Sequence, residues 1–223
     1  MKTFKLHLIR HGMTEGNLKG LYIGSGTDIP LCDEGRAQLQ ELKERFEYPQ
    51  VDTVFSSPLM RSVETANILF PNATHQFSVH DLREAGFGVF ENRPVKELVK
   101  DEDFKKWITP GSGFVPEGAE PTEQFHARCA ETLLKLFEYM IRMDVTEAAC
   151  VTHGGVIHEY AEPACPPLPP PGAVDGRPRL RLHCPDRCSA LDAGPPGGGH
   201  RHRALWLCRY PAGPGRDRGK RSV

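Results

Sequence analysis

The sequence predicts an α/β protein, a three-layer α/β/α sandwich in which helices cover both faces of a mostly parallel sheet. Two observations carry this prediction. Short apolar runs of strand length alternate with longer segments of helical spacing, and the alternation continues to about residue 158. The chain has 223 residues, 39% of them apolar, which is enough for one hydrophobic core. We therefore expect a single domain over residues 1–158.

The first elements expected are a strand, a helix and a second strand. Residues 4–9 form an apolar run that predicts a buried strand. Residues 33–46 carry apolar side chains at helical spacing, and the acidic pair at their start suits the positive end of a helix dipole. Cys32 precedes them as a poor helix cap. Residues 51–55 are the second short apolar run.

The remaining elements repeat the alternation. Pro58 suits the start of a helix that runs to about residue 69, because proline lacks an N–H group that the first turn would leave unpaired. Residues 77–79 predict a third strand, and residues 120–143 predict the longest helix, with one apolar stripe. Residues 148–152 predict the last strand, and Gly154 opens the next helix.

Charge and composition exclude several classes of protein. The formal net charge is -1 and the isoelectric point is near 6.8, which disfavours nucleic acid and membrane surfaces as partners. No stretch reaches the roughly 20 apolar residues that span a bilayer. Cys32, Cys129 and Cys150 stand singly, as reduced thiols do. We expect a cytoplasmic protein, and the sequence predicts no particular oligomeric state.

Residues 159–223 differ in kind from the rest of the chain. They hold 12 of the 20 prolines and 10 arginines against one lysine, and they lack Ile, Phe, Met, Asn, Gln and Thr. Such a composition buries too little apolar surface to offset the entropy of ordering a chain. We interpret this segment as disordered, or as the product of a reading-frame shift shortly after Ile157.

A zinc site in this segment is the rival interpretation. Zinc ligands usually come in close pairs on a small ordered scaffold. Here Cys184 and Cys188 are four residues apart, the next candidates follow a PPGGG run, and no hydrophobic element supports them. We therefore assign no metal site to the candidate ligands, which are His183, Cys184, Cys188, His200, His202 and Cys208.

Charged side chains gather where the predicted strands end. Arg10 and His11 follow the first strand, and His153 follows the last one. Ligands of parallel sheets bind beyond the carboxyl ends of the strands, so these residues are candidates for one site. Arg61, three residues into a predicted helix, and Glu84, in a glycine-rich loop, complete a set suited to phosphate. The planar guanidinium of arginine matches pairs of phosphate oxygens.

Two glycines adjoin this set. Gly12 and Gly154 would let backbone N–H groups approach an oxyanion. Gly154 also lies where the positive end of a helix would point.

Four ordered motifs carry a resemblance. "RHG" at residues 10–12 with Thr14 and Asn17 behind it, "SSPLMRSVETA", "LREAGFG" and "THGG" resemble the histidine phosphatase superfamily, which includes cofactor-dependent phosphoglycerate mutases and small phosphatases. The resemblance covers about residues 3–157. It implies a phosphoglycerate mutase-like fold that is incomplete at its C-terminus, because residues 159–223 are unlike the family.

The resemblance implies a two-step transfer of a phosphoryl group. His11 would attack phosphorus and become phosphohistidine, and water would then release phosphate. Arg10, Arg61 and His153 would hold the phosphoryl oxygens. Glu84 would protonate the leaving group and then deprotonate the water. Further contacts with the substrate would come from Thr14 and Asn17, and no metal or other cofactor would be needed.

The same family contains phosphatases and mutases. Mutases usually place a tryptophan before the asparagine and a long insertion between the acid and the second histidine. Here Gly16 precedes Asn17, and His153 comes only 69 positions after Glu84. We therefore expect a phosphomonoesterase that acts on a small phosphate monoester, similar to the small bacterial phosphatases that resemble alpha-ribazole phosphatase. The alternatives are mutase-type transfer and an inactive remnant that only binds phosphate.

Overall fold

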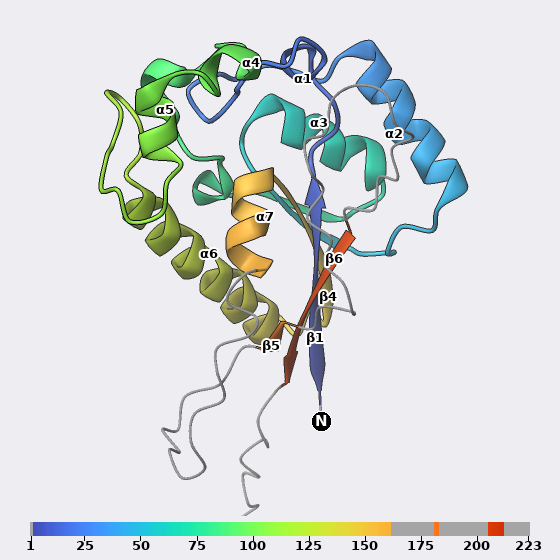
Figure 1. Ribbon diagram of the computed structural model, residues 1–223. Coiled ribbons are helices and arrows are strands. Elements are labelled where there is room, and N and C mark those ends of the chain that lie inside the picture. The colour runs from blue at the N-terminus through green and yellow to red at the C-terminus, as the bar shows by residue number, and fades with distance from the viewer. Residues whose placement is uncertain (1, 162–180, 183–204, 212–223) are drawn as a thin grey trace, which may run out of the picture.

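A mostly parallel sheet forms the centre of the molecule (Figure 1). The computed structural model describes residues 2–161, 181–182 and 205–211. Within them the strand order is β3-β2-β4-β1-β6-β5, and the first four of these strands run parallel. β6 pairs with β1, and β5 with β6, in antiparallel fashion. The strands are β1 (Thr3–Arg10), β2 (Thr53–Ser56), β3 (His75–Ser78), β4 (Glu147–Thr152), β5 (Arg181–Leu182) and β6 (Leu205–Pro211).

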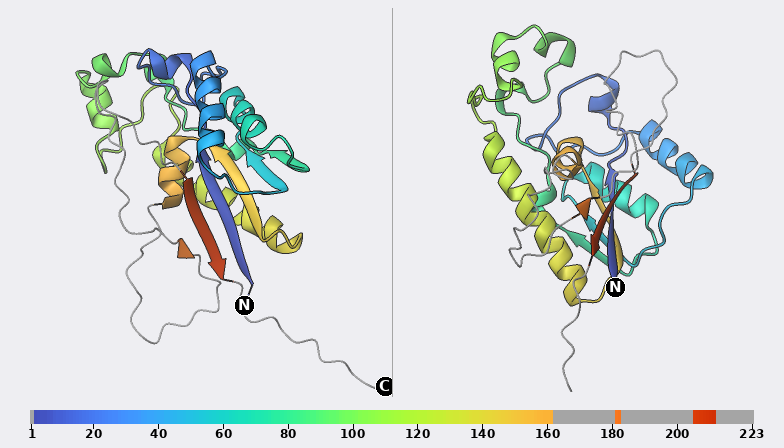
Figure 2. Two further views of the ribbon diagram at one scale, coloured as in Figure 1. Left: turned by 90° about the vertical axis from the view of Figure 1, so that its right-hand side faces the viewer. Right: turned by 60° about the horizontal axis from the view of Figure 1, so that its bottom comes forward.

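Helices cover both faces of this sheet, which confirms the three-layer prediction (Figures 1 and 2). One face packs against α2 (Asp33–Arg45) and α3 (Met60–Leu69). The other packs against α6 (Thr122–Arg142) and α7 (Gly154–Ala161). Each predicted strand and helix of residues 4–158 is present, with ends that differ by two residues at most because pairing and capping decide where an element stops.

The core follows from the two-residue period of a strand. Leu6 and Leu8 of β1 face α6 and α7, whereas Ile9 faces α2 and α3. Burial of one such side chain contributes about 1.5–3 kcal/mol to folding. In α6 the predicted apolar stripe is the buried face, with Leu136 and Phe137 almost inaccessible.

Cys32 caps α2 despite the expectation of a poor cap. Its Sγ accepts a hydrogen bond from the N–H of Gly35 at 3.3 Å, and its thiol donates to the carbonyl of Met13 at 3.4 Å. The cap is therefore tied to the loop that follows β1.

The short helices were not predicted from the sequence. A helix of one or two turns has little periodicity and little intrinsic stability, so tertiary contacts decide whether it forms. Most of them pack around an aromatic cluster in which Tyr22 stacks on Phe87 at 4.1 Å between ring centres, beside Trp107. These helices are α1 (Glu15–Leu18), η1 (His80–Leu82), η2 (Gly88–Phe90), α4 (Val95–Leu98) and α5 (Glu102–Trp107).

The segment 159–223 lies largely outside the described residues. Its described parts are the end of α7 and the strands β5 and β6, for which the sequence offered no periodic pattern. The frame-shift hypothesis for this segment stays a prediction. Of the candidate zinc ligands, Cys208 falls within β6 and the other five lie outside the described residues.

Two searches of the described residues gave negative results. No group of three or more His, Cys, Asp or Glu side chains in this part of the chain is arranged to hold a metal ion. In the same part, no helix combines the length and the apolarity that crossing a membrane requires.

Candidate active site

The carboxyl ends of three strands meet at one edge of the sheet. The N–H of His11 donates to the carbonyl of Thr152 at 2.9 Å, and the N–H of Ser57 donates to the carbonyl of Val151 at 2.9 Å. The parallel pairings of β1 and β2 with β4 thus bring His11, Ser57 and His153 together. This places two of the predicted residues where the sequence reasoning expected them.

His11 is held in one tautomer. Its Nδ1 lies 2.7 Å from the carbonyl oxygen of Gly12, and since a carbonyl only accepts, Nδ1 carries the hydrogen. Nε2 then keeps a lone pair. Burial, together with the charges of Arg61 and Arg10, lowers the pKa of His11 to about 3 against the opposing effect of the Gly12 hydrogen bond. The imidazole is therefore neutral and nucleophilic at physiological pH.

His153 lies beside His11 but deeper in the protein. The ring centres are 5.1 Å apart, and His153 is almost fully buried. Its Nε2 is 2.7 Å from the hydroxyl of Ser57. That hydroxyl accepts from the N–H of Leu59 at 3.4 Å, so its own hydrogen is available for Nε2.

In the tautomer in which this hydroxyl donates to Nε2, Nδ1 of His153 carries the ring's hydrogen. Among the described residues this buried nitrogen has no hydrogen-bond partner. Burial, with the neighbouring His11 next in importance, holds the pKa of His153 well below its usual value. A buried donor without a partner costs free energy, and a ligand oxygen would relieve that cost. His153 is therefore suited to donate to a phosphoryl oxygen.

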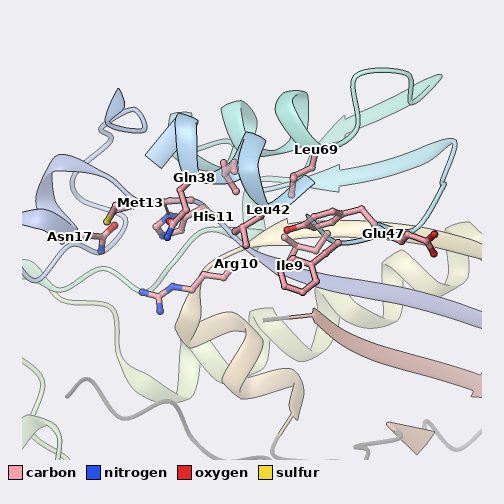
Figure 3. A pocket seen from close by; sticks show the side chains of 13 residues that line it. Ile9, Arg10, His11, Met13, Asn17, Gln38, Leu42, Glu47 and Leu69 are labelled. Atoms are coloured by element: carbon pink, nitrogen blue, oxygen red, sulfur yellow. Dashed lines mark hydrogen bonds between the residues drawn. The ribbon is translucent and has the colours of Figure 1, made fainter. Parts of the chain in front are cut away.

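Two arginines supply positive charge. Arg61 is buried, and its Nη1 and Nη2 donate at 3.0 Å to the carbonyls of Thr27 and Gly24. Burial lowers the pKa of Arg61, although nearby carboxylates oppose this effect. Arg10 is exposed and extends past His11 toward Asn17 (Figure 3). One arginine is thus fixed in the protein and the other is accessible.

Glu84 faces the start of α7. Its Oε2 accepts from the N–H of Gly155 at 2.9 Å, and its Oε1 accepts from the N–H of Ala85 at 3.0 Å. Burial raises the pKa of the Glu84 carboxyl, and these two hydrogen bonds oppose the rise. A buried carboxyl with a raised pKa is able to carry a proton to a leaving group.

Arg128 of α6 holds the segment that carries Glu84. Its Nη1 donates at 2.9 Å to the carbonyls of Asp81 and Arg83, and its Nη2 donates at 3.1 Å to that of Glu84. The guanidinium also pairs in bidentate fashion with Glu120, at 2.6 and 2.7 Å. Sequence reasoning missed Arg128, although a cation next to Cys129 at the border of an apolar helix stripe was a visible signal.

Gly155 is a second residue that the sequence reasoning missed, since it selected Gly154. A Cβ atom on Gly155 would lie 2.3 Å from Oε1 of Glu84, which is too close. A Cβ on Gly154 would lie 3.7 Å from Cζ of Arg10, an ordinary contact. The second glycine of "THGG" therefore makes room for Glu84, and the first adjoins Arg10.

Gly12, the glycine of "RHG", was expected to offer its N–H to an oxyanion, but in the structure this N–H has a protein partner. The N–H of Gly12 donates to the hydroxyl of Thr65 at 2.9 Å, so it is already engaged. That hydroxyl donates in turn to the carbonyl of Arg61 at 2.6 Å. A Cβ on Gly12 would lie 2.7 Å from Leu39, so glycine is needed here for close packing. Thr65, in "SVETA", thereby links α3 to the loop of His11.

Thr14 and Asn17 form the capping box of α1. Oδ1 of Asn17 accepts from the N–H of Thr14 at 3.0 Å and from its hydroxyl at 2.9 Å. The carbonyl end of the side chain is thus occupied, which leaves the amide nitrogen of Asn17 as its group for a ligand. Thr14 is buried and acts through Asn17.

A cavity of about 540 Å³ opens beside His11 (Figure 3). Arg10, His11 and Asn17 lie at one end, apolar side chains such as Leu42 and Leu69 line the middle, and Glu47 lies at the other end. The cavity therefore combines a cationic end with an apolar body.

Comparisons with known proteins agree with this arrangement. Residues 6–165 match the family described as the histidine phosphatase superfamily (branch 1). Fructose-2,6-bisphosphatase TIGAR B of Danio rerio is 31% identical over 193 residues, which cover 82% of this chain and 69% of that protein. Adenosylcobalamin/alpha-ribazole phosphatase of Salmonella typhimurium is 30% identical over 156 residues, or 69% of this chain and 75% of the relative.

Solved structures give the same result. The crystal structure of the alpha-ribazole phosphatase from Shigella flexneri superposes with a TM-score of 0.60 at 29% identity. The match covers 69% of this chain and 76% of that one. The sequence and the fold therefore lead to one family.

Proposed function

Because the chain belongs to the histidine phosphatase superfamily (branch 1), we propose that it hydrolyses phosphate monoesters of small metabolites through a phosphohistidine on His11. The observation that carries the proposal is the state of His11. Its Nδ1 is engaged by a carbonyl, its pKa is lowered to about 3, and it adjoins Arg10, Arg61 and His153. A neutral imidazole with a free Nε2 is the nucleophile that this reaction needs.

In the first step Nε2 of His11 attacks phosphorus, and the bond from phosphorus to the ester oxygen breaks. Glu84 in its protonated form gives its proton to that oxygen, which leaves as an alcohol. The guanidinium groups of Arg10 and Arg61 and the Nδ1–H of His153 stabilise the negative charge on the phosphoryl oxygens. Preorganised charges of this kind supply most of the acceleration in phosphoryl transfer.

In the second step water attacks phosphorus, and the bond from phosphorus to Nε2 breaks. The carboxylate of Glu84 takes a proton from the water, which restores the acid for the next turnover. Inorganic phosphate leaves, and His11 is again neutral. We propose that no metal ion takes part, because the two arginines supply the positive charge. Dialysis against EDTA should leave the rate unchanged, and loss that a divalent ion restores would contradict this proposal.

The relatives carry names of different phosphatases, including a fructose-2,6-bisphosphatase and an alpha-ribazole phosphatase. We therefore propose small phosphorylated metabolites as the substrate class, rather than nucleic acid. A panel of phosphometabolites identifies the member with the highest kcat/KM.

We also propose a cytoplasmic location. Cys32 and Cys129 are buried thiols outside any disulfide within the described part of the chain, as a reducing compartment favours. Cell fractionation that recovers the protein elsewhere would contradict this.

Trapping the covalent intermediate tests the main proposal. The protein is mixed with a substrate labelled with ³²P, quenched at alkaline pH, at which phosphohistidine survives, and digested. Label should appear on the peptide that contains His11. It should be absent in His11→Ala and present in His126→Ala, whose ring lies on the exposed side of α6. Turnover without label on the His11 peptide would overturn the proposal.

The same experiment separates the alternatives. A mutase returns the label to a second acceptor alcohol rather than to water. A remnant that only binds phosphate shows neither label nor turnover, although it retains affinity for inorganic phosphate.

A further inference from the structure

Glu91 lies outside the proposed chemistry, yet its carboxylate gathers four hydrogen-bond donors. Oε2 accepts from the N–H of Gly24 and from the hydroxyl of Thr27, both at 3.0 Å. Oε1 accepts from the N–H of Gly26 at 3.0 Å and from that of Phe87 at 3.2 Å. An exposed glutamate satisfies its oxygens with water, so four protein donors indicate a built arrangement.

Three of these donors come from residues 24–27, the segment that also holds Arg61. The carbonyls of Gly24 and Thr27 accept from Nη2 and Nη1 of Arg61, both at 3.0 Å. The segment therefore lies between two opposite charges, with donors directed to Glu91 and carbonyls directed to Arg61. The peptide N–H groups of Gly24 and Gly26 are directed to the negative charge, and the carbonyls of two other peptide groups are directed to the positive charge.

Gly24 in this segment has no room for a side chain. A Cβ on Gly24 would lie 2.3 Å from the carbonyl oxygen of Ala85 and 2.6 Å from Oε1 of Glu91. The N–H of Ser25 donates to the same Ala85 carbonyl at 3.0 Å. The glycine thus permits a close approach that both Glu91 and the segment of Glu84 require.

Glu91 also acts on Arg61 through its charge. Burial lowers the pKa of Arg61, and the negative charges of Glu84, Asp28 and Glu91 counter that effect. Loss of Glu91 would remove the four hydrogen bonds and part of the negative charge that offsets the cost of burying a guanidinium.

We propose that Glu91 is the positioning residue for Arg61: it orders residues 24–27, whose carbonyls orient the guanidinium toward the phosphoryl group. The proposal rests on the proposed function of this site. It assigns to Glu91 no contact with the substrate, so its effect must pass through Arg61.

A double-mutant cycle on the binding of inorganic phosphate tests this. Calorimetry compares the unchanged protein with Glu91→Gln, Arg61→Lys and the double variant. Glutamine replaces one acceptor oxygen with an NH₂ group that cannot accept from the N–H groups. Because a misplacement of about 1 Å can cost 10²-fold, Glu91→Gln alone should weaken phosphate binding about tenfold or more. In the Arg61→Lys background it should have little further effect.

Equal weakening in both backgrounds, or no weakening in either, would overturn the proposal. The matched control is Glu97→Gln on α4, which removes the same charge from an exposed position and should leave phosphate affinity unchanged. If Glu91→Gln does not fold, Thr27→Val removes one of the four donors and should give a smaller change with the same dependence on Arg61.

Phosphate binding requires no turnover, so the proposed function is tested independently. Label on a residue other than His11 would reject the phosphohistidine while the coupling between Glu91 and Arg61 stood. Additive effects in the cycle would reject the positioning role while the phosphohistidine stood.

Discussion

The two halves of the site are built in different ways. The histidine half, His11 and His153, follows β1 and β4 and is placed by the hydrogen bonds of the sheet. The charged half, Arg61 and Glu84, is placed by loop carbonyls and by the side chains of Glu91 and Arg128. The backbone hydrogen bonds of a sheet persist through most side-chain substitutions. A single mutation, by contrast, removes a charged side chain together with its hydrogen bonds. Distant substitutions should therefore disturb the charged half first.

The largest effect is expected from a substitution in the histidine half. His11→Ala removes the proposed nucleophile, so kcat should fall on the order of 10⁴-fold or more. Steady-state hydrolysis of p-nitrophenyl phosphate measures it, with His126→Ala as the control. Thermal unfolding should show that the variant stays folded, because the ring of His11 is only partly buried. A rate equal to that of the unchanged protein would show that His11 is not the nucleophile.

The next largest effect is expected from a substitution in α7 that displaces Glu84 of the charged half. Gly155→Ala places a Cβ against Oε1 of Glu84 and should displace the carboxyl, at a cost of about 10²-fold in kcat. The neighbouring change Gly154→Ala meets only ordinary contact distances and should cost much less. Larger damage from Gly154→Ala than from Gly155→Ala would contradict the steric argument. Both variants are compared in the same hydrolysis assay.

The pH dependence distinguishes the two halves, because His11 acts without a bound proton on Nε2 and Glu84 acts with a bound proton. His11 must be neutral, and its pKa is about 3, so kcat/KM should lose activity on the acid side only near pH 3. Glu84 must be protonated in the first step, so kcat/KM should fall as pH rises through the raised pKa of Glu84, about tenfold per unit.

The alkaline fall should vanish in Glu84→Gln, which does not titrate. A profile of kcat/KM against pH for both proteins measures this, after allowance for ionisation of the substrate phosphate. An unchanged alkaline limb in Glu84→Gln would assign that limb to another group.

A smaller effect comes from the clamp on Glu84. Arg128→Gln loses three hydrogen bonds to the segment of residues 81–84, and kcat should fall about tenfold as Glu84 becomes less ordered. Arg142→Gln, an exposed change at the end of the same helix, is the matched control. If Arg128→Gln lowers only the melting temperature, Arg128 stabilises the fold without ordering the acid.

The smallest effect is expected at Cys32, outside both halves. Cys32→Ser replaces a weak cap by a strong one, and the stability should rise by up to about 1 kcal/mol. Urea unfolding measures the change, and kcat should stay constant. A fall in stability would show that burial of the sulfur matters more than its hydrogen bond.

Prediction from the sequence succeeded where a repeating pattern met a repeating structure. The apolar run of residues 4–9 predicted β1, and the apolar stripe of residues 120–143 predicted α6. Their positions just after strand ends identified His11 and His153 as site candidates. The short helices between residues 80 and 107 escaped prediction. They have few residues to show a period, and an aromatic cluster assembled from distant segments holds those from residue 88 onward.

By itself the sequence determined the alternation of elements, the edge of the sheet that carries the site, and the chemical types of its residues. The need for Gly155 and the contacts of Arg128 and Glu91 were settled only by the tertiary fold. These depend on atoms tens of residues apart that approach within hydrogen-bonding distance. A local pattern records the conformation of its own segment, whereas such contacts exist only after the chain has folded.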